Sequence, residues 1–274
     1  MKLRNLAAFF FLAYIISWLI WLPLYVPYFG ITLINPLPYN HALGGLGPVI
    51  AAFIVYAFES GKAGISSLVK SMISVKVKIW TLLCAIAGPF ILLLIACLIS
   101  YLQSGIVPDI SRVGLSKEYP QFSVIAYAIF NLVFFGFGEE AGWRGYALPK
   151  LQQKYNAFIA SIILTLGWAL WHLPLFLYRP GYVQMDAAGI FGWTFSLLTG
   201  SILLTWLFNS SRGSVLICAI FHATIDIAFV TDTSTPEIVN YIGMLITLLG
   251  IAVLIFAKPQ NLSRGKKVTS LERT

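Results

Sequence analysis

Six ionisable side chains inside otherwise apolar segments are the residues of this sequence that could do chemistry. One segment carries two carboxylates and an arginine, the next carries a histidine, and a third carries a histidine and an aspartate: Glu139, Glu140, Arg144, His172, His222 and Asp226. A charged group at the centre of a bilayer costs about 2.5–3.5 kcal/mol on insertion scales, so such residues indicate function. A carboxylate and an imidazole in one pocket can activate water for hydrolysis.

The spacing of these residues assigns partners to some of them. Glu140 and Arg144 are four residues apart, so they share a helix face and can form an ion pair with a supporting role. Glu139 is rotated by about 100° from that face and stays available. His222 and Asp226 are also four residues apart. Asp226 can therefore orient the imidazole or join it at a common centre.

Two kinds of peptide hydrolysis fit this set, and the residues alone do not choose between them. In the first, Glu139 and His172 hold and deprotonate a water molecule, while His222 and Asp226 stabilise the tetrahedral oxygen. In the second, His172, His222 and a carboxylate bind Zn²⁺ or another divalent metal, which lowers the pKa of its bound water to about 7. No cofactor is certain, and a metal site at Glu139, His172, His222 and Asp226 is one alternative.

The composition predicts the elements that must position these residues. Of 274 residues, 59% are hydrophobic and 10% are charged, against a usual charged share of about 25%, and the mean hydropathy is +0.85. We therefore expect an all-α, polytopic membrane helical bundle. Eight segments have about the length that a membrane-spanning helix needs: 6–28, 42–58, 79–100, 124–148, 157–178, 187–208, 214–231 and 238–257.

The distribution of basic residues predicts the orientation. With a cytoplasmic N-terminus, both tails and the loops on the same side collect 14 of the 18 Lys and Arg residues, and the opposite loops hold only Arg112, Lys117 and Arg179. The positive-inside rule then places both termini in the cytoplasm. We expect one membrane domain over 1–257 and a basic cytoplasmic tail over 258–274. The basic residues are spread between apolar runs, so the net charge of +8 does not indicate nucleic acid as a partner.

The candidate residues also lie at similar depths. Glu139 and His172 are each 16 residues into their predicted spans and His222 is nine residues into its own, so a shared intramembrane pocket is geometrically feasible. Gly136, Gly138, Gly142 and Gly145 would let other backbones approach. His41 opens the second span, and we expect it at the membrane interface. The four lysines of segment 59–78 fit either an amphipathic surface helix or a short basic loop.

Three motifs in order resemble the CPBP intramembrane protease family, also called the CAAX protease or Abi family, which includes Rce1. They are Glu139-Glu140-x-x-x-Arg144, Trp168-x-x-x-His172 and His222-x-x-x-Asp226, within a core of about 124–231. The resemblance implies that Glu139 is the catalytic glutamate and His172 its partner, that His222 and Asp226 form the oxyanion or metal side, and that the site opens toward the cytoplasm or the membrane. Two positions depart from relatives. Trp168 stands where many have Phe, which we expect to alter packing more than chemistry, and Asp226 stands where Rce1-type members have Asn.

The function expected from these features is intramembrane endopeptidase. Its partners would be the lipid bilayer and a peptide or membrane-protein substrate, with a lipidated substrate among the options, in the plasma membrane of a prokaryote. The alternative is a non-enzymatic bacteriocin-immunity or scaffold protein that binds a peptide through the same pocket. A proton-coupled transporter fits less well, because no pair of interrupted spans marks a transport repeat. A haem protein with two histidine ligands fits the adjacent carboxylates poorly.

Overall fold

The protein is built from helices, and the computed structural model describes residues 3–32 and 35–271. No strand occurs in this part of the chain. The helices in chain order are α1 Leu3–Tyr25, η1 Val26–Phe29, α2 Asn40–Gly44, α3 Gly47–Met72, α4 Ile79–Ser104, α5 Val124–Asn131, η2 Leu132–Phe137, α6 Gly138–Gly142, η3 Trp143–Ala147, α7 Leu148–Lys154, α8 Ala157–Trp171, α9 Leu175–Tyr178, α10 Ala187–Ser210, α11 Val215–Val230 and α12 Ile238–Ala257.

Seven apolar helical stretches in the described chain are long enough to cross a membrane by length and composition. The seventh predicted span, 214–231, corresponds to α11, which has only 16 residues against about 20 for a full crossing. This helix lies inside the bundle, where it contacts α4, α10 and the η2–α6 segment. The predicted all-α polytopic bundle is confirmed, with one short helix at its centre.

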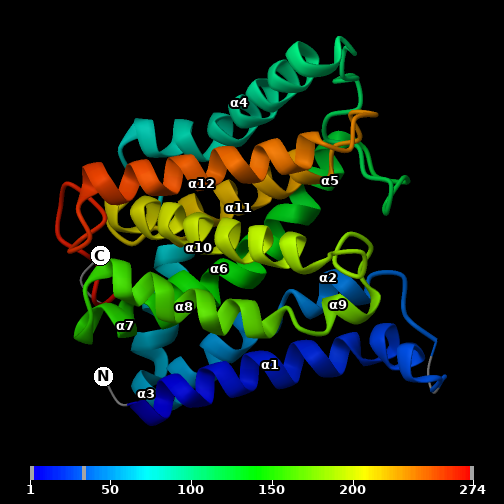
Figure 1. The fold of residues 1–274 in the computed structure, drawn as a ribbon. Coiled ribbons are helices and arrows are strands. Elements are labelled where there is room, and N and C mark those ends of the chain that lie inside the picture. Colours follow the sequence, from blue (N-terminus) through cyan, green and yellow to red (C-terminus); the bar gives the residue numbers. More distant parts are fainter. Residues whose placement is uncertain (1–2, 33–34, 272–274) are drawn as a thin grey trace.

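The long helices run side by side, and both termini lie at one end of the bundle (Figure 1). We call this the terminal end. The opposite end carries η1, α2, α9 and the connections α4–α5, α8–α10 and α11–α12. We call it the distal end. Successive long helices run in opposite directions, so the connections between them alternate between the terminal end and the distal end.

The segment that carries Glu139, Glu140 and Arg144 is not a uniform α-helix. Two π-helical turns, η2 and η3, flank the short helix α6, whereas the sequence predicts one helix over 124–148. Its glycines allow close backbone approach, as expected. A Cβ atom at Gly136 would lie 2.6 Å from the Ala219 carbonyl oxygen of α11, and one at Gly142 would lie 2.5 Å from Pro48 of α3. The three segments are therefore packed backbone to backbone around the carboxylates.

The predicted span 157–178 is broken at His172. Asn156 caps the start of α8 by accepting a hydrogen bond from the Ile159 N–H, and α8 ends at Trp171. Pro174 follows, and a proline has no N–H with which to continue the α-helical hydrogen bonds. His172 therefore occupies the C-cap position of α8, at a helix end.

The chain beyond α12 folds back onto the terminal end. Leu262 is fully buried and Leu271 is 3% exposed. The side chains of Gln152 and Asn209 donate to the backbone carbonyls of Val268 and Asn261. Segment 59–78 is mostly helical, because α3 continues to Met72 through a kink at Gly61, where φ is 58°.

Candidate active site

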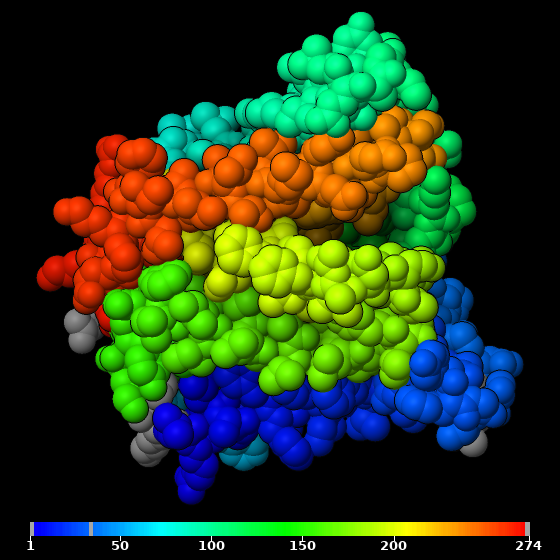
Figure 2. Space-filling view, in the orientation of Figure 1, coloured from blue at the N-terminus to red at the C-terminus, as the bar shows by residue number. Residues whose placement is uncertain are grey.

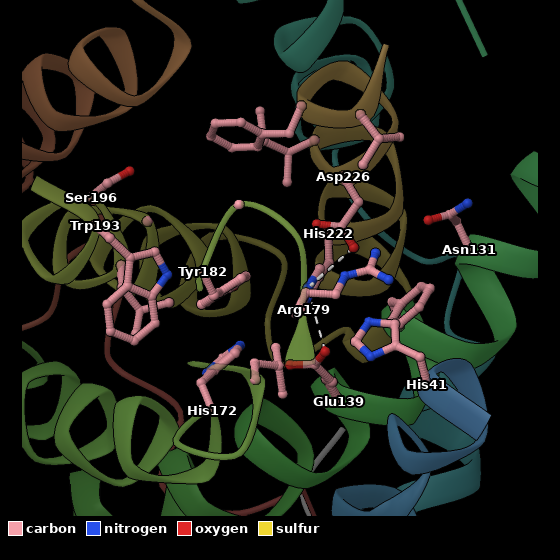
Figure 3. A pocket seen from close by; sticks show the side chains of 18 of the residues that line it. His41, Asn131, Glu139, His172, Arg179, Tyr182, Trp193, Ser196, His222 and Asp226 are labelled. Carbon is pink, nitrogen blue, oxygen red and sulfur yellow. Dashed lines mark ion pairs between the residues drawn. The ribbon is translucent and has the colours of Figure 1, made fainter. Parts of the chain in front are cut away.

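A cavity of about 510 Å³ brings together the four residues predicted to be catalytic, Glu139, His172, His222 and Asp226. Figure 3 shows that they come from separate elements and lie around one space. Glu139 lies in α6, His172 at the end of α8, and His222 and Asp226 in α11. Most of the other lining side chains are aromatic or aliphatic, so the polar groups are few and placed in an apolar setting.

Glu139 is held by one carboxylate oxygen. Its Oε2 accepts hydrogen bonds from the indole N–H of Trp168 at 2.8 Å and from that of Trp143 at 3.4 Å. Its Oε1 lies 3.9 Å from Nε2 of His222, which is too long for a hydrogen bond. The side chain is 6% exposed. One oxygen is thus fixed, and the other is free to take a proton from a water molecule.

His172 is oriented by the backbone of the same tryptophan. Its Nδ1 lies 2.7 Å from the Trp168 carbonyl oxygen, and because a carbonyl only accepts, Nδ1 carries the proton. In the neutral ring, Nε2 is then the acceptor. Trp168 therefore orients Glu139 through its side chain and His172 through its backbone. The hydrogen bond from its N–H to Glu139 gives this tryptophan a polar contact in the site, beside the packing role expected from the sequence.

His222 is oriented by Glu140 and not by Asp226. Its Nδ1 donates to Glu140 Oε1 at 2.7 Å, so the second nitrogen, Nε2, faces the cavity. Asp226 Oδ2 is 3.7 Å from Nε2, beyond hydrogen-bond distance. Figure 3 shows Nε2 lying between the two carboxylates of Glu139 and Asp226. The side chain of Asp226 therefore lies beside the Nε2 atom that faces the cavity, and Glu140 contacts the other nitrogen.

The predicted Glu140–Arg144 ion pair is present and fully buried. Arg144 Nη1 donates to Glu140 Oε1 at 3.0 Å, and both side chains are 0% exposed. Arg144 Nη2 donates to the Ser201 hydroxyl at 3.0 Å, and the guanidinium lies over the Trp168 ring at 4.8 Å. The same carboxylate oxygen therefore accepts from Arg144 and His222, which couples this ion pair to the imidazole.

Several lining residues lie outside the sequence motifs. His41 reaches the cavity from α2, its Nδ1 2.8 Å from the Tyr178 hydroxyl, although we expected it at the membrane interface. Arg179 also lines the cavity and forms an ion pair of 2.6 Å with Glu118. Burial opposes the charge of Arg179, but Glu118 more than offsets this and raises the pKa of the guanidinium. These residues lie in short helices and connections, where no periodic pattern marks them.

Tyr182 covers His172 from the α8–α10 connection. The two rings are stacked, with centroids 6.2 Å apart and an interplanar angle of 10°. Burial raises the pKa of Tyr182 to about 12, so the phenol stays neutral at physiological pH. It can help to enclose the imidazole without adding charge.

The described residues do not include three His, Cys, Asp or Glu side chains grouped so that they could hold a metal ion. His222 has one nitrogen committed to Glu140, and His172 has one committed to the Trp168 carbonyl. An imidazole whose Nδ1–H donates to a carbonyl or a carboxylate can use Nε2 either to hold a water molecule or to ligate a metal, so these two hydrogen bonds fit both alternatives. No step derived below depends on a divalent metal.

Comparisons with known proteins point to the same segment of the chain. Residues 121–228 match the family described as "Type II CAAX prenyl endopeptidase Rce1-like". We refer to this matched segment as the Rce1-like domain. A relative from Methanococcus maripaludis, named CAAX prenyl protease 2, is 27% identical over 271 residues, which covers 93% of this chain and 94% of the relative. The similarity therefore extends beyond the Rce1-like domain to nearly the whole length of both chains.

The Rce1-like domain contains all six residues singled out from the sequence. It also contains Trp168, which fixes Glu139, and Arg179 at the cavity. Glu118 and His41 lie before the matched segment. The cavity is thus formed mainly by the Rce1-like domain and completed by flanking elements.

Proposed function

We propose that the protein is an intramembrane endopeptidase whose active site is the cavity of the Rce1-like domain. The observation that carries this proposal is the arrangement of Glu139. One of its oxygens is fixed by two indole N–H donors, and the other lies 3.9 Å from Nε2 of His222. A buried carboxylate held in this way, beside two imidazoles in one cavity, is suited to general-base catalysis.

In the proposed reaction, a water molecule attacks the carbonyl carbon of the scissile peptide bond. Glu139 Oε1 takes one water proton, and Nε2 of His172 accepts a hydrogen bond from the same water. In its doubly protonated form, His222 donates from Nε2 to the oxygen of the tetrahedral intermediate. Collapse of the intermediate breaks the C–N bond, and the proton held by Glu139 passes to the leaving amine.

Glu140 and Arg144 support this reaction without touching the substrate. Glu140 accepts from Nδ1 of His222 at 2.7 Å and is itself paired with Arg144 at 3.0 Å. This contact fixes the ring of His222 so that Nε2 points to the cavity. Asp226, 3.7 Å from Nε2, would act in its protonated form, by donating to the same oxygen of the intermediate.

The substrate class follows from the lining of the cavity. Aromatic and aliphatic side chains form most of its wall, so apolar peptide segments and lipidated peptides fit it best. The matched family and the relative's name, CAAX prenyl protease 2, support a prenylated protein as one such substrate. The source of this relative, Methanococcus maripaludis, supports the plasma membrane of a prokaryote as the location.

A comparison of protein N-termini by mass spectrometry tests the proposed activity. Membranes from cells that express the wild type are compared with membranes from cells that express Glu139→Ala. We expect new termini that depend on Glu139, His172 and His222. Cleavage that persists at equal rates in all three alanine variants would exclude this site as the protease centre. An equal amount of folded protein in each strain is the required control.

A further inference from the structure

A second cavity, of about 890 Å³, lies apart from the candidate active site. Part of its lining comes from the α3–α4 connection, the α10–α11 turn and the tail after α12, which meet at the terminal end (Figure 1). Of the described residues, none lines both cavities. A volume of this size is within the range of about 300–1,000 Å³ that is usual for small-molecule sites. The cavity is therefore a separate candidate binding site.

The lining of this cavity is strongly basic, and we call it the basic cavity. No acidic side chain occurs among the described residues that line it, whereas five are basic: Lys78, Arg212, Arg264, Lys266 and Lys267. None of these five forms an ion pair within the part of the chain that the structure describes. Lys267 donates a hydrogen bond to the Tyr155 carbonyl, and burial lowers the pKa of its amine. A cavity lined by charges of one sign attracts ligands of the opposite sign.

The basic residues of the distal end are arranged differently, because all three of them are paired. Arg112 and Lys117 lie 3.2 Å and 3.1 Å from Asp232, and Arg179 lies 2.6 Å from Glu118. An excess of cations at one end of a membrane protein can serve topology alone. Topology does not require five unpaired cations to surround one cavity, so their convergence points to a ligand.

The tail that supplies three of these cations is fixed on the bundle. Gln152 Nε2 donates to the Val268 carbonyl at 2.7 Å, and Asn209 Nδ2 donates to the Asn261 carbonyl at 2.8 Å. The Val268 N–H donates to Asn209 Oδ1 at 3.0 Å. Figure 2 shows the tail, in red, at the terminal end beside the α7–α8 segment. The backbone that carries the cations of 264–267 is therefore in place before a ligand binds, which lowers the entropic cost of binding.

Another part of the wall is aromatic and belongs to helices that can cross a membrane. Trp80 of α4 and Trp206 of α10 line the basic cavity, with ring centroids 5.4 Å apart. Both helices are long and apolar enough for a membrane span, and Ile79 and Leu83 of α4 are exposed. Tryptophan is enriched where membrane helices pass from hydrocarbon to headgroups. The basic cavity therefore adjoins a surface that suits lipid chains.

We infer that the basic cavity binds the phosphate-bearing headgroup of an anionic membrane lipid, with the hydrocarbon chains of the lipid against the exposed apolar surface of α4. Lys and Arg donate charge-assisted hydrogen bonds to phosphate oxygens, and basic pockets between membrane helices bind headgroups of this kind. Inorganic phosphate offers the same oxygens but makes no use of the apolar surface beside Trp80. This site is separate from the active site, and the inference does not rest on the proposed function.

A lipid titration of the purified full-length chain in a non-ionic detergent tests the assignment. The probe is fluorescently labelled phosphatidylglycerol, and the unlabelled competitors are phosphatidylglycerol, phosphatidylcholine and inorganic phosphate. We expect saturable binding of one lipid, with phosphatidylglycerol about ten-fold tighter than the zwitterionic phosphatidylcholine. Equal competition by both lipids would overturn the inference. Displacement by inorganic phosphate at the same concentration as by unlabelled phosphatidylglycerol would assign the cavity to a free anion and overturn the lipid.

Two double variants with the same change in charge test the location. Arg264→Gln/Lys266→Gln removes two exposed cations of the basic cavity, and Lys62→Gln/Lys70→Gln removes two exposed cations of α3 that do not line it. We expect the affinity for phosphatidylglycerol to fall about 10- to 30-fold in the cavity variant. It should change by less than about two-fold in the α3 variant, because distant surface charges are screened. Equal losses would show a general attraction to the basic surface and would overturn the site.

Arg212→Asn keeps the test valid if the double variant folds poorly. Arg212 has a φ of 59°, a region in which Asn is tolerated better than Arg, so the substitution removes a cation without straining the turn. We expect an unchanged or higher midpoint of thermal unfolding and about five-fold weaker binding of phosphatidylglycerol. Unchanged binding in this folded variant would overturn the inference. No cleavage is measured, so the result is independent of the proposed protease activity.

Discussion

Trp168 links the two residues proposed to activate water. Its indole N–H donates to Glu139 and its carbonyl accepts from His172. We expect Trp168→Phe to lower kcat on the order of 10- to 100-fold with little change in KM. A hydrogen bond to a charged group contributes about 1.5–3 kcal/mol, and a loss of that size in the transition state corresponds to such a fall in rate. Steady-state cleavage of a peptide substrate in detergent measures it.

Trp171→Phe is the matched control for this change. The Trp171 side-chain N–H is buried and has no hydrogen-bond partner among the described residues, and its ring packs against His172 with centroids 4.9 Å apart. Removing this N–H should leave kcat within about two-fold, since no hydrogen bond to the carboxylate is lost. Equal losses in both variants would show that ring packing, and not the hydrogen bond to Glu139, is responsible.

Arg144 contributes to stability through a buried charge. Replacing it with Met leaves the 0% exposed Glu140 carboxylate without the guanidinium and with the hydrogen bond from His222 alone. We expect Arg144→Met to lower the free energy of unfolding by about 3–5 kcal/mol, because one partner of a buried ion pair is removed. The midpoint of thermal unfolding in detergent reports the loss.

Ser201→Ala provides the comparison for Arg144. It removes the hydroxyl that accepts from Arg144 Nη2 and leaves the Glu140–Arg144 pair intact. The expected loss is about 1 kcal/mol, the usual contribution of one hydrogen bond. If Arg144→Met were no more destabilising than Ser201→Ala, the ion pair would contribute little to the fold.

At the scale of elements, the distance between η2 and α11 sets the position of Glu139 relative to His222. A Cβ atom at Gly136 would come 2.6 Å from the Ala219 carbonyl oxygen. We expect Gly136→Ala to push the two segments apart, to destabilise the protein by about 1–3 kcal/mol and to reduce cleavage at least ten-fold. Unfolding midpoints and cleavage rates are measured on the same preparations.

Gly192→Ala tests whether this effect is specific to the contact. A Cβ atom at Gly192 meets nothing within 4 Å, and Ala has a higher helix propensity than Gly. Stability should stay the same or rise slightly, with cleavage unchanged. A comparable loss in this variant would mean that glycine flexibility, and not close packing at η2, explains the first result.

Some elements follow from sequence pattern and others do not. Long apolar runs predict the spans well, because burial in lipid requires both length and low polarity. The π-helical turns beside α6 carry no such pattern, since they arise where Gly136 and Gly142 pack against other backbones. The break of the helix at His172 could have been anticipated from Pro174, but proline is also tolerated within membrane helices.

At the scale of the whole molecule, two ion-pair groups tie distant segments together across the distal end. Lys117 and the Ser234 backbone N–H donate to Asp232 and lower the pKa of its carboxyl group. A lowered pKa means that the stabilisation is present above the usual value near 4 and is lost as the pH falls below it. The stabilisation from the Asp232 ion pairs should therefore be constant between pH 5 and 8.

We expect Asp232→Asn to increase hydrogen exchange in residues 105–123 at neutral pH, because Arg112 and Lys117 lose their shared partner. High salt should produce part of the same effect in the wild type, since these pairs are exposed and easily screened. Asp186→Asn, which keeps a side-chain oxygen to cap α10, should leave the segment unchanged. Faster exchange in both variants would indicate a general loosening of the distal end.

The catalytic candidates are easier to predict from the sequence than the residues that surround them. Glu139, His172, His222 and Asp226 stand out because an ionisable group within an apolar run is costly, and all four line one cavity. The hydrogen bond between Glu140 and His222 joins residues 82 positions apart and depends on how α6 packs on α11. Spacing along one helix favours contacts between residues four positions apart. It therefore predicts Asp226, and not Glu140, as the residue that orients His222.

The short central helix α11 has a consequence for how the protein is made. It has 16 residues and carries both His222 and Asp226, so it is too short and too polar to be held in a bilayer alone. Neighbouring helices must already be in place to receive it, and six of the seven long apolar stretches in the described part of the chain come before it. A nascent chain therefore has no assembled protease centre until these six stretches and α11 have been synthesised. Cleavage during biogenesis is thereby delayed until the bundle is complete.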